Sequence, residues 1–300
     1  MKQPLAGRIA TALAAPVAQP VRAFAERLAE AAGARAALFY GSNLRTGALD
    51  GVLDFYLLRD GPVENGIWPR VSYHEWDSGG GVLRAKAATM TLATFLAAAR
   101  GELLDTTIWA RFTQPAALVW SRDATAAGDV AAAVAQATMT AARLAAALGP
   151  AQGEDLDYWR ALFRATYAAE FRVEKAGRED SILSLNRAHF DGLLPVALEA
   201  AGISCPRHDG GIAPALAPAE RARIQRWWRR RCRLGKPYNL LRLLRAATTF
   251  EGAARYAAWK IERHTGVAVP LTPWRERHPV LAAPGVLWRV WRARRAGPQS

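Results

Sequence analysis

Cysteine and histidine are scarce in this 300-residue chain, which holds two cysteines and five histidines. Cys205 and Cys232 stand far apart, and neither belongs to a Cys-x-x-Cys pair or another ligand spacing. No two histidines have the spacing of metal ligands. We therefore expect reduced thiols in an intracellular setting, and histidines that are simply hydrogen-bonded or exposed.

Long apolar runs are also missing. No window reaches the ~18 uninterrupted apolar residues that a membrane span needs. The first 22 residues are rich in alanine, but Pro4, Pro16 and Pro20 interrupt them. We therefore expect neither a secretory signal nor a membrane-spanning segment.

Acidic residues are outnumbered, 26 against 40 basic ones, which leaves a formal charge of +14. The excess is concentrated in two segments, 226–236 and 289–295, and no acidic residue follows Glu276. Such an asymmetry favours an anionic partner, either nucleic acid or a membrane rich in acidic lipid.

The most informative stretch consists of two apolar runs, 36–40 and 52–58, that are joined through a Gly-Ser turn. Two such runs predict neighbouring buried strands. Gly41 has no Cβ and Ser42 carries a hydroxyl, so this turn can approach an anion closely. Asp54, in the middle of the second run, is expected to point toward the same place and hold Mg²⁺ against a triphosphate. This is the layout of the nucleotidyltransferase fold; the alternative is two ordinary core strands with a solvent-facing Asp54.

Apolar or alternating runs predict further strands over 70–76, 82–90 and 116–120. Apolar spacings of three and four predict helices over 21–32, 91–104, 123–148, 155–176, 180–201, 219–233 and 238–264. We expect an exposed loop over 202–218, an irregular segment over 266–284 and a short helix over 286–294.

These elements predict an α+β protein: a nucleotidyltransferase-type mixed sheet with flanking helices, followed by a mostly helical C-terminal region. The expected domains are 1–150 for the nucleotidyltransferase unit, 151–265 for the helical unit, and 266–300 for an irregular segment with a basic amphipathic tail.

A second metal ligand is not obvious, because Val52 stands where most nucleotidyltransferases have a carboxylate. Asp50 lies four residues before Asp54, roughly 13 Å away along a strand, which is too far to share one ion. Glu75, on the next strand of the chain, is the first candidate, and Glu170 is the second. Lys86, in the middle of a strand, either grips a phosphate as a point charge or lies at a solvated edge.

Five elements resemble the mitochondrial-type phosphatidate cytidylyltransferases, the translocator assembly and maintenance family. In chain order they are Tyr40-Gly41-Ser42, Leu53-Asp54-Phe55, Val71-Ser72-Tyr73, the segment 109–115, and the segment 167–172. The resemblance covers roughly residues 36–195, and its last element carries most of the weight. The chain departs from the family pattern at three positions, Asn43, Ala169 and Glu170.

The resemblance implies Mg²⁺-dependent transfer of CMP from CTP to phosphatidate, which gives CDP-diacylglycerol and pyrophosphate. A phosphomonoester is already ionised at neutral pH, so such a reaction needs no strong general base. The implied catalytic residues are Asp54, Lys86 and Glu75, with Asp54 and Glu75 as metal ligands. The implied nucleotide-binding residues are Tyr40, Gly41, Ser42, Arg111, Glu170 and Arg172.

The tail would bring such an enzyme to its lipid. Tryptophans favour the membrane interface, and arginines favour anionic headgroups. We therefore expect Trp288, Trp291, Arg289 and Arg292 to bind the membrane, with a second contact at 227–231. The protein would then be cytoplasmic and peripherally associated with the inner face of the membrane.

Three alternatives stay open. The tryptophans of these basic segments could pack on the protein's own core. A nucleotidyltransferase with the same core could act on RNA or another polar acceptor, because arginines interleaved with aromatic residues also bind nucleic acid. The chain could also be a membrane-associated homologue that has lost its activity.

Overall fold

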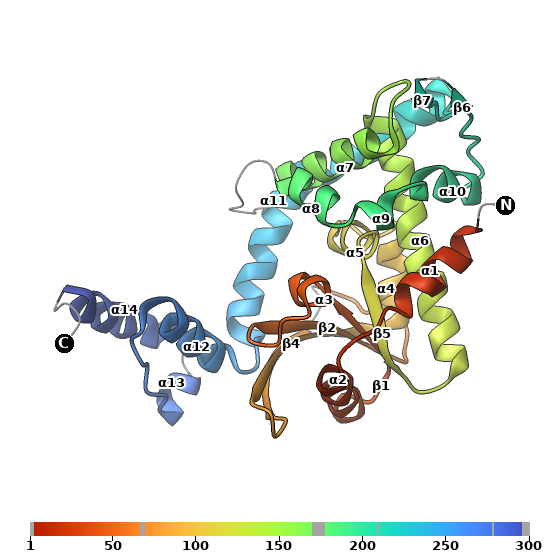
Figure 1. The fold of residues 1–300 in the computed structure, drawn as a ribbon. Helices are drawn as coiled ribbons and strands as arrows, with labels where there is room; N and C mark the ends of the chain where they lie inside the picture. The colour runs from red at the N-terminus through yellow and green to blue at the C-terminus, as the bar shows by residue number, and fades with distance from the viewer. Residues whose placement is uncertain (1–2, 67–69, 170–177, 209, 278, 296–300) are drawn as a thin grey trace.

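The computed structural model describes residues 3–66, 70–169, 178–208, 210–277 and 279–295. Its centre is a five-stranded mixed sheet in the order β3-β4-β2-β1-β5 (Figure 1). The strands are β1 (Ala34–Tyr40), β2 (Val52–Arg59), β3 (Arg70–Asp77), β4 (Val82–Thr91) and β5 (Ala116–Ser121). Strands β2 and β4 are parallel, and the other neighbours are antiparallel. All five predicted strands are confirmed, and with them the α+β class.

Both faces of the sheet are covered, which explains why β2 reads as a continuous apolar run. Leu53, Phe55 and Leu57 pack with helix α2 (Gln19–Ala31) on one face. Tyr56 and Leu58 belong to the larger cluster on the other face. Asp54 shares that second face, because side chains alternate along a strand.

The larger cluster is built around α6 (Ala124–Leu148), which contacts helices from both halves of the chain. Around it lie α1 (Leu5–Leu13), α4 (Leu92–Ala99), α5 (Thr107–Phe112), α7 (Asp155–Ala169), α10 (Leu193–Ala200) and α11 (Pro218–Thr249). Among the described helices, α6 alone is long and apolar enough to cross a bilayer, and most of that stretch is buried inside the protein.

Several helices differ from their predicted bounds. The helix expected over 180–201 is divided into α8 (Arg178–Leu185), α9 (Arg187–Phe190) and α10, because Asn186 leaves the helical conformation before α9 and Gly192 is left-handed before α10. The expected loop 202–218 contains a small hairpin of β6 (Arg207–His208) and β7 (Gly211–Ile212), and it buries Ile203 and Cys205. The helix expected over 91–104 ends at Ala99, because Gly101 is left-handed.

The C-terminal region is more helical than predicted. Helix α11 runs through Pro237 without a break and ends near Thr249, and α12 (Ala253–Thr265) starts after the left-handed Gly252. The segment expected to be irregular contains α13 (Pro273–Arg277) and the start of α14 (Pro279–Arg295). Both begin with a proline, which suits the first turn of a helix. Helices α12 to α14 extend to one side of the body (Figure 1).

Candidate active site

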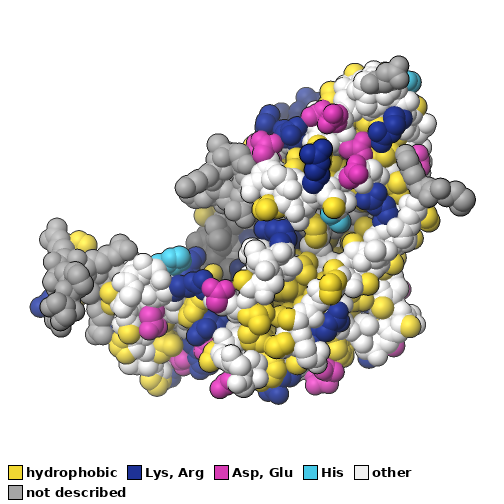
Figure 2. Space-filling view, in the orientation of Figure 1, with side chains coloured by type: hydrophobic (Ala, Val, Ile, Leu, Met, Phe, Trp, Pro, Cys, Tyr) yellow, Lys and Arg dark blue, Asp and Glu magenta, His cyan; other side chains and the backbone are white. Residues whose placement is uncertain are grey.

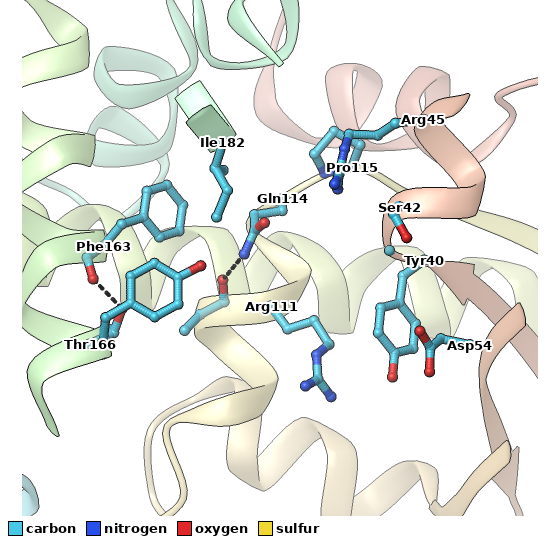
Figure 3. A pocket seen from close by; sticks show the side chains of 13 residues that line it. Tyr40, Ser42, Arg45, Asp54, Arg111, Gln114, Pro115, Phe163, Thr166 and Ile182 are labelled. Carbon is cyan, nitrogen blue, oxygen red and sulfur yellow. Dashed lines mark hydrogen bonds between the residues drawn. The ribbon is translucent and has the colours of Figure 1, made fainter. Parts of the chain in front are cut away.

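A pocket opens at the end of β1, between the sheet and the helices α5, α7 and α8 (Figure 3). Its lining residues are Tyr40, Gly41, Ser42, Arg45, Asp54, Ala110, Arg111, Gln114, Pro115, Phe163, Thr166, Tyr167 and Ile182. The structure therefore brings together five residues predicted from the sequence: Tyr40, Gly41, Ser42, Asp54 and Arg111.

Gly41 lies beside Asp54 in this pocket. Its φ of 95° lies in a region that residues with a side chain rarely adopt. A Cβ at this position would stand 3.4 Å from Oδ2 of Asp54. The glycine thus keeps the space beside the carboxylate open, as a cradle for a ligand requires.

Ser42 begins the short helix α3 (Ser42–Thr46), and the residue after it stabilises the loop. The Nδ2 of Asn43 donates to the carbonyl of Ala48 at 2.8 Å, and the Ser42 hydroxyl donates to Oδ1 of Asn43 at 3.3 Å. Asn43, which departs from the family pattern, therefore closes the connection toward β2.

The charges of two cationic side chains, Lys86 and Arg111, act on Asp54. It lies directly opposite Tyr40 on β1 and directly opposite Lys86 on β4. Burial raises the pKa of the Asp54 carboxyl above its usual value, while the charges of Lys86 and Arg111 act in the opposite direction. An ionised carboxylate here is costly by itself, so it is suited to a site where a cation binds.

Arg111 is fixed on the pocket wall by aromatic residues. Its Nη1 donates to the hydroxyl of Tyr56 at 2.9 Å, and its guanidinium lies 4.9 Å from the ring centre of Tyr40. Tyr56 is buried, and burial raises the pKa of its hydroxyl. The planar guanidinium therefore faces the pocket in a defined orientation (Figure 3).

Lys86 lies in the row of residues that crosses the sheet from Tyr40 through Asp54 to Tyr73 on β3. Burial lowers the pKa of its ammonium group, and Asp54 opposes that shift. The alternative of a solvated edge is wrong for Lys86, because its strand β4 is inside the sheet.

Glu75 is not brought to Asp54. Strand β3 follows β2 in the chain, but β4 lies between them in the sheet, so the two strands are about 10 Å apart. Glu75 stands opposite Arg84, accepts a hydrogen bond from the Tyr73 hydroxyl at 2.8 Å and lies 3.3 Å from Nε of Arg84. The arrangement does not support the prediction that Glu75 shares a metal ion with Asp54.

The other predicted carboxylate, Glu170, and the predicted phosphate ligand Arg172 lie outside the described residues. Within the described part of the chain, no group of three or more His, Cys, Asp or Glu side chains could hold a metal. Asp54 is then the single described carboxylate of the pocket. Magnesium ions that arrive with a nucleotide are commonly held by one or two carboxylates plus phosphate oxygens. The space that Gly41 leaves beside Asp54 fits this mode of binding.

In the apolar wall of the pocket, Tyr167 begins the segment 167–172 that was identified in the sequence, whereas Phe163 and Ile182 were not predicted as site residues. Phe163 and Tyr167 stand one helical turn apart on α7, and Ile182 on α8 lies near Phe163 (Figure 3). Arg45 adds a further cation from α3. Its position three residues after Ser42 is the sequence signal that could have identified it, because both lie on one short helix.

The described tryptophans of the C-terminal tail are exposed. The exposed fractions are 58% for Trp288 and 50% for Trp291, and the Arg292 guanidinium lies 5.4 Å from the ring centre of Trp288. The side chain of Arg289 lies outside the described ones. By contrast, Trp228 and Arg231 are only 6% and 5% exposed. The interpretation of 227–231 as a second membrane contact is therefore wrong for these two residues, which pack α11 against the core.

A comparison of the sequence with models of known protein families and with curated proteins finds no match.

Proposed function

We propose that the protein is a nucleotidyltransferase that transfers CMP from CTP to phosphatidate, giving CDP-diacylglycerol and pyrophosphate. One observation carries the proposal: Gly41 leaves open space directly beside Asp54, and Lys86 and Arg111 act on that carboxylate. A triphosphate is the kind of ligand that needs a cradle without side chains, a carboxylate for its metal ion and surrounding cations. The resemblance of residues 36–195 to the phosphatidate cytidylyltransferases supplies the nucleotide and the acceptor.

In the proposed reaction an oxygen of the phosphatidate phosphate attacks the α-phosphorus of CTP. The new bond joins that oxygen to the α-phosphorus, while the bond between the α-phosphorus and the bridging oxygen to the β-phosphate breaks. The electron pair leaves with pyrophosphate. Negative charge builds up on the leaving group, so cations placed around it lower the barrier.

The chain's own residues orient the triphosphate. The backbone at Gly41 and the hydroxyl of Ser42 bind the β- and γ-phosphates at the end of β1. Arg111 presents a planar guanidinium whose direction is fixed by Tyr56 and Tyr40. Asp54 would hold Mg²⁺, which, when bound, offsets charge on the leaving pyrophosphate.

Helices α13 and α14 expose side chains that are suited to binding the membrane in which a lipid acceptor resides. The three tryptophans Trp274, Trp288 and Trp291 of α13 and α14 are at least half exposed, and Leu281 is 68% exposed. Basic residues accompany them, including Arg275, Arg277 and Arg292. Tryptophan and arginine together favour an anionic membrane surface. We infer that α13 and α14 bind the inner face of the membrane peripherally.

A panel of the four nucleoside triphosphates, incubated with phosphatidate vesicles and Mg²⁺, tests the proposal through pyrophosphate release. We expect release with CTP, dependent on phosphatidate, and its loss in Asp54→Asn. The matched control is Asp60→Asn, which neutralises a carboxylate just past the other end of β2 that pairs with Arg35 and Arg122. Release that depends on RNA instead of phosphatidate would favour the polar-acceptor alternative. No release with any nucleotide would favour a homologue that has lost its activity.

A further inference from the structure

A row of four side chains crosses the sheet on the face that carries the pocket. Tyr40, Asp54, Lys86 and Tyr73 stand directly opposite one another on β1, β2, β4 and β3. Asp54 therefore has the Gly41-Ser42 turn on one side and Lys86 on the other. The pocket described above lies on the side of the turn.

Helix α12 continues this row beyond the sheet. The ring of Tyr256 lies 5.5 Å from the ring of Tyr73, and Nζ of Lys260 lies 5.8 Å from the ring centre of Tyr256. Lys260 is close enough to Lys86 for its charge to lower the pKa of that buried ammonium. Two lysines from distant parts of the chain thus approach the same side of Asp54, and Figure 2 shows basic side chains, with acidic ones beside them, where the C-terminal helices meet the body.

The position of α12 is fixed by backbone contacts with the edge strand. The amide of Tyr73 donates to the carbonyl of Glu251 at 2.8 Å, and the amide of Glu251 donates to the carbonyl of Val71 at 3.3 Å. Gly252 has a φ of 79°, and a Cβ there would stand 2.9 Å from the carbonyl oxygen of Tyr73. The start of α12 is therefore built onto β3, and Lys260 is presented two turns later.

Lys86 and Lys260 are the two lysines on this side of the row, and the nearby carboxylates Asp54 and Glu75 face Lys86 and Arg84. Glu75, which shares this face, is engaged by Arg84 and Tyr73. Among the described residues, Lys260 makes a ring contact with Tyr256 and no ion pair. Burial lowers the pKa of Lys86, Asp54 acts in the opposite direction, and the charges of Arg111, Lys260 and Arg242 lower that pKa further, although Arg242 also pairs with Asp105 at 2.6 Å. An additional anion between Lys86 and Lys260 would offset this repulsion.

We propose that Lys86 and Lys260 bind the phosphomonoester of the acceptor, on the side of Asp54 opposite the Gly41-Ser42 turn. This inference rests on the proposed function and deepens it by placing the second substrate. In-line transfer requires the attacking and leaving oxygens to be on opposite sides of the phosphorus. The row across the sheet provides that arrangement, because the turn would hold the leaving phosphates and the lysines would hold the nucleophile.

Lysines suit a phosphomonoester because each presents a compact positive charge to a dianion. The phosphate could belong to a lipid headgroup or to a soluble phosphate ester, and both have the same charged group. Three soluble probes distinguish these two sources. They are a short-chain phosphatidate below its critical micelle concentration, glycerol 3-phosphate and inorganic phosphate. Tighter binding of the short-chain phosphatidate identifies the lipid as the source, and equal binding of the first two probes identifies a soluble ester.

Calorimetric titration of these three probes and of CTP tests the site in the wild type, Lys260→Gln and Arg263→Gln. Lys260 is exposed, so its replacement should leave the fold intact. Arg263 is the matched control, because it lies one turn further along α12 and pairs with Asp50 instead. We expect Lys260→Gln to weaken phosphomonoester binding about tenfold, as for one charge-assisted contact, and to leave CTP binding unchanged. Arg263→Gln should bind all probes like the wild type.

Three results would overturn the site: equal phosphomonoester binding by Lys260→Gln and the wild type, an equal loss in Arg263→Gln, or no phosphomonoester binding by the wild type. The proposed function is tested separately, by the release of pyrophosphate. Lys260-dependent phosphate binding without any pyrophosphate release would refute the function and support the site. Pyrophosphate release with the same acceptor KM in Lys260→Gln and the wild type would support the function and refute the site.

Discussion

Asp54 and Lys86 lie directly opposite each other on the parallel strands β2 and β4, and burial disfavours the charged form of both. Each of the two charges favours the ionised form of the other group, but burial has the larger effect. The pKa of Asp54 is therefore raised and the pKa of Lys86 is lowered. A pair maintained at this cost is typical of a functional site, where stability is exchanged for reactivity.

Replacement of Asp54 by asparagine should abolish turnover and at the same time stabilise the fold. A carboxyl whose pKa is raised in the folded state destabilises the protein at pH values above its ordinary value of 3.8. Asp54→Asn should therefore gain on the order of 1 kcal/mol at pH 7, and the gain should vanish as the pH falls toward and below 3.8. Chemical denaturation at several pH values measures it. A variant less stable than the wild type at pH 7 would contradict the burial argument.

Replacement of Gly41 by alanine should prevent CTP binding. The backbone of Gly41, with φ 95° and ψ −162°, lies in a region that is essentially restricted to glycine and costs another residue on the order of 1–3 kcal/mol, and the new methyl group would fill the space beside Asp54. Gly47→Ala is the matched control, because Gly47 has a φ of 68° and open space around its Cβ position. Both variants should lose stability, but only Gly41→Ala should lose CTP affinity in a direct titration. Equal CTP affinity in the two variants would show that the turn is structural only.

Arg111 should affect both stability and activity, and a double mutant separates the two effects. Arg111→Met leaves the buried Tyr56 hydroxyl without its donor, which should cost about 1–3 kcal/mol. Tyr56→Phe in the same chain removes that unsatisfied hydroxyl, so we expect part of the stability to return while turnover stays lost. Recovery of turnover in the double mutant would mean that Arg111 serves the fold and not the substrate.

The dependence of turnover on pH should report Lys86 on its alkaline side. Burial lowers the pKa of Lys86 below the ordinary 10.5, so the ammonium loses its proton at a lower pH than a free lysine. The acceptor KM should then rise with pH before 10.5 is reached. In Lys86→Arg the charge persists, because a guanidinium does not lose its proton in this range, and the rise should move to higher pH. An identical profile in both proteins would exclude Lys86 as the titrating group.

The exposed tryptophans of α14 should account for the part of membrane binding that salt does not screen. Binding of the wild type to anionic vesicles should weaken with salt, because its basic residues act through a screened field. The double variant Trp288→Ala and Trp291→Ala should bind more weakly than the wild type at high salt, because burial of apolar surface is not screened. Vesicle flotation over a salt series, with uncharged vesicles as the control, measures both components. Equal flotation of the variant and the wild type at high salt would contradict the anchor.

The strands and the turn at Gly41 could be predicted from the sequence because their signals are local. A run such as 52–58 is apolar on both faces, and the glycine marks the close approach. The order of the strands could not be predicted. The hydrophobic pattern of 70–76 is the same whether β3 pairs with β2 or with β4, and that choice determines whether Glu75 reaches Asp54.

The bounds and packing of the C-terminal helices could not be predicted from the sequence either. Pro237 indicates a break in α11, yet the chain bends at Phe250–Gly252, where Glu251 pairs with β3. The apolar wall of Phe163 and Ile182 also depends on how α7 and α8 pack, which periodicity does not specify. Buried Trp228 and exposed Trp288 both stand among arginines in the sequence, and only the tertiary structure distinguishes them.

The most direct test of the account is analysis of the lipid product. The wild type, Asp54→Asn and Asp60→Asn are incubated with CTP, Mg²⁺ and phosphatidate vesicles, and the extracted lipids are analysed by mass spectrometry. The account predicts CDP-diacylglycerol with the wild type and with Asp60→Asn, and none with Asp54→Asn. Absence of CDP-diacylglycerol with the folded wild type, or equal amounts with Asp54→Asn, would contradict it.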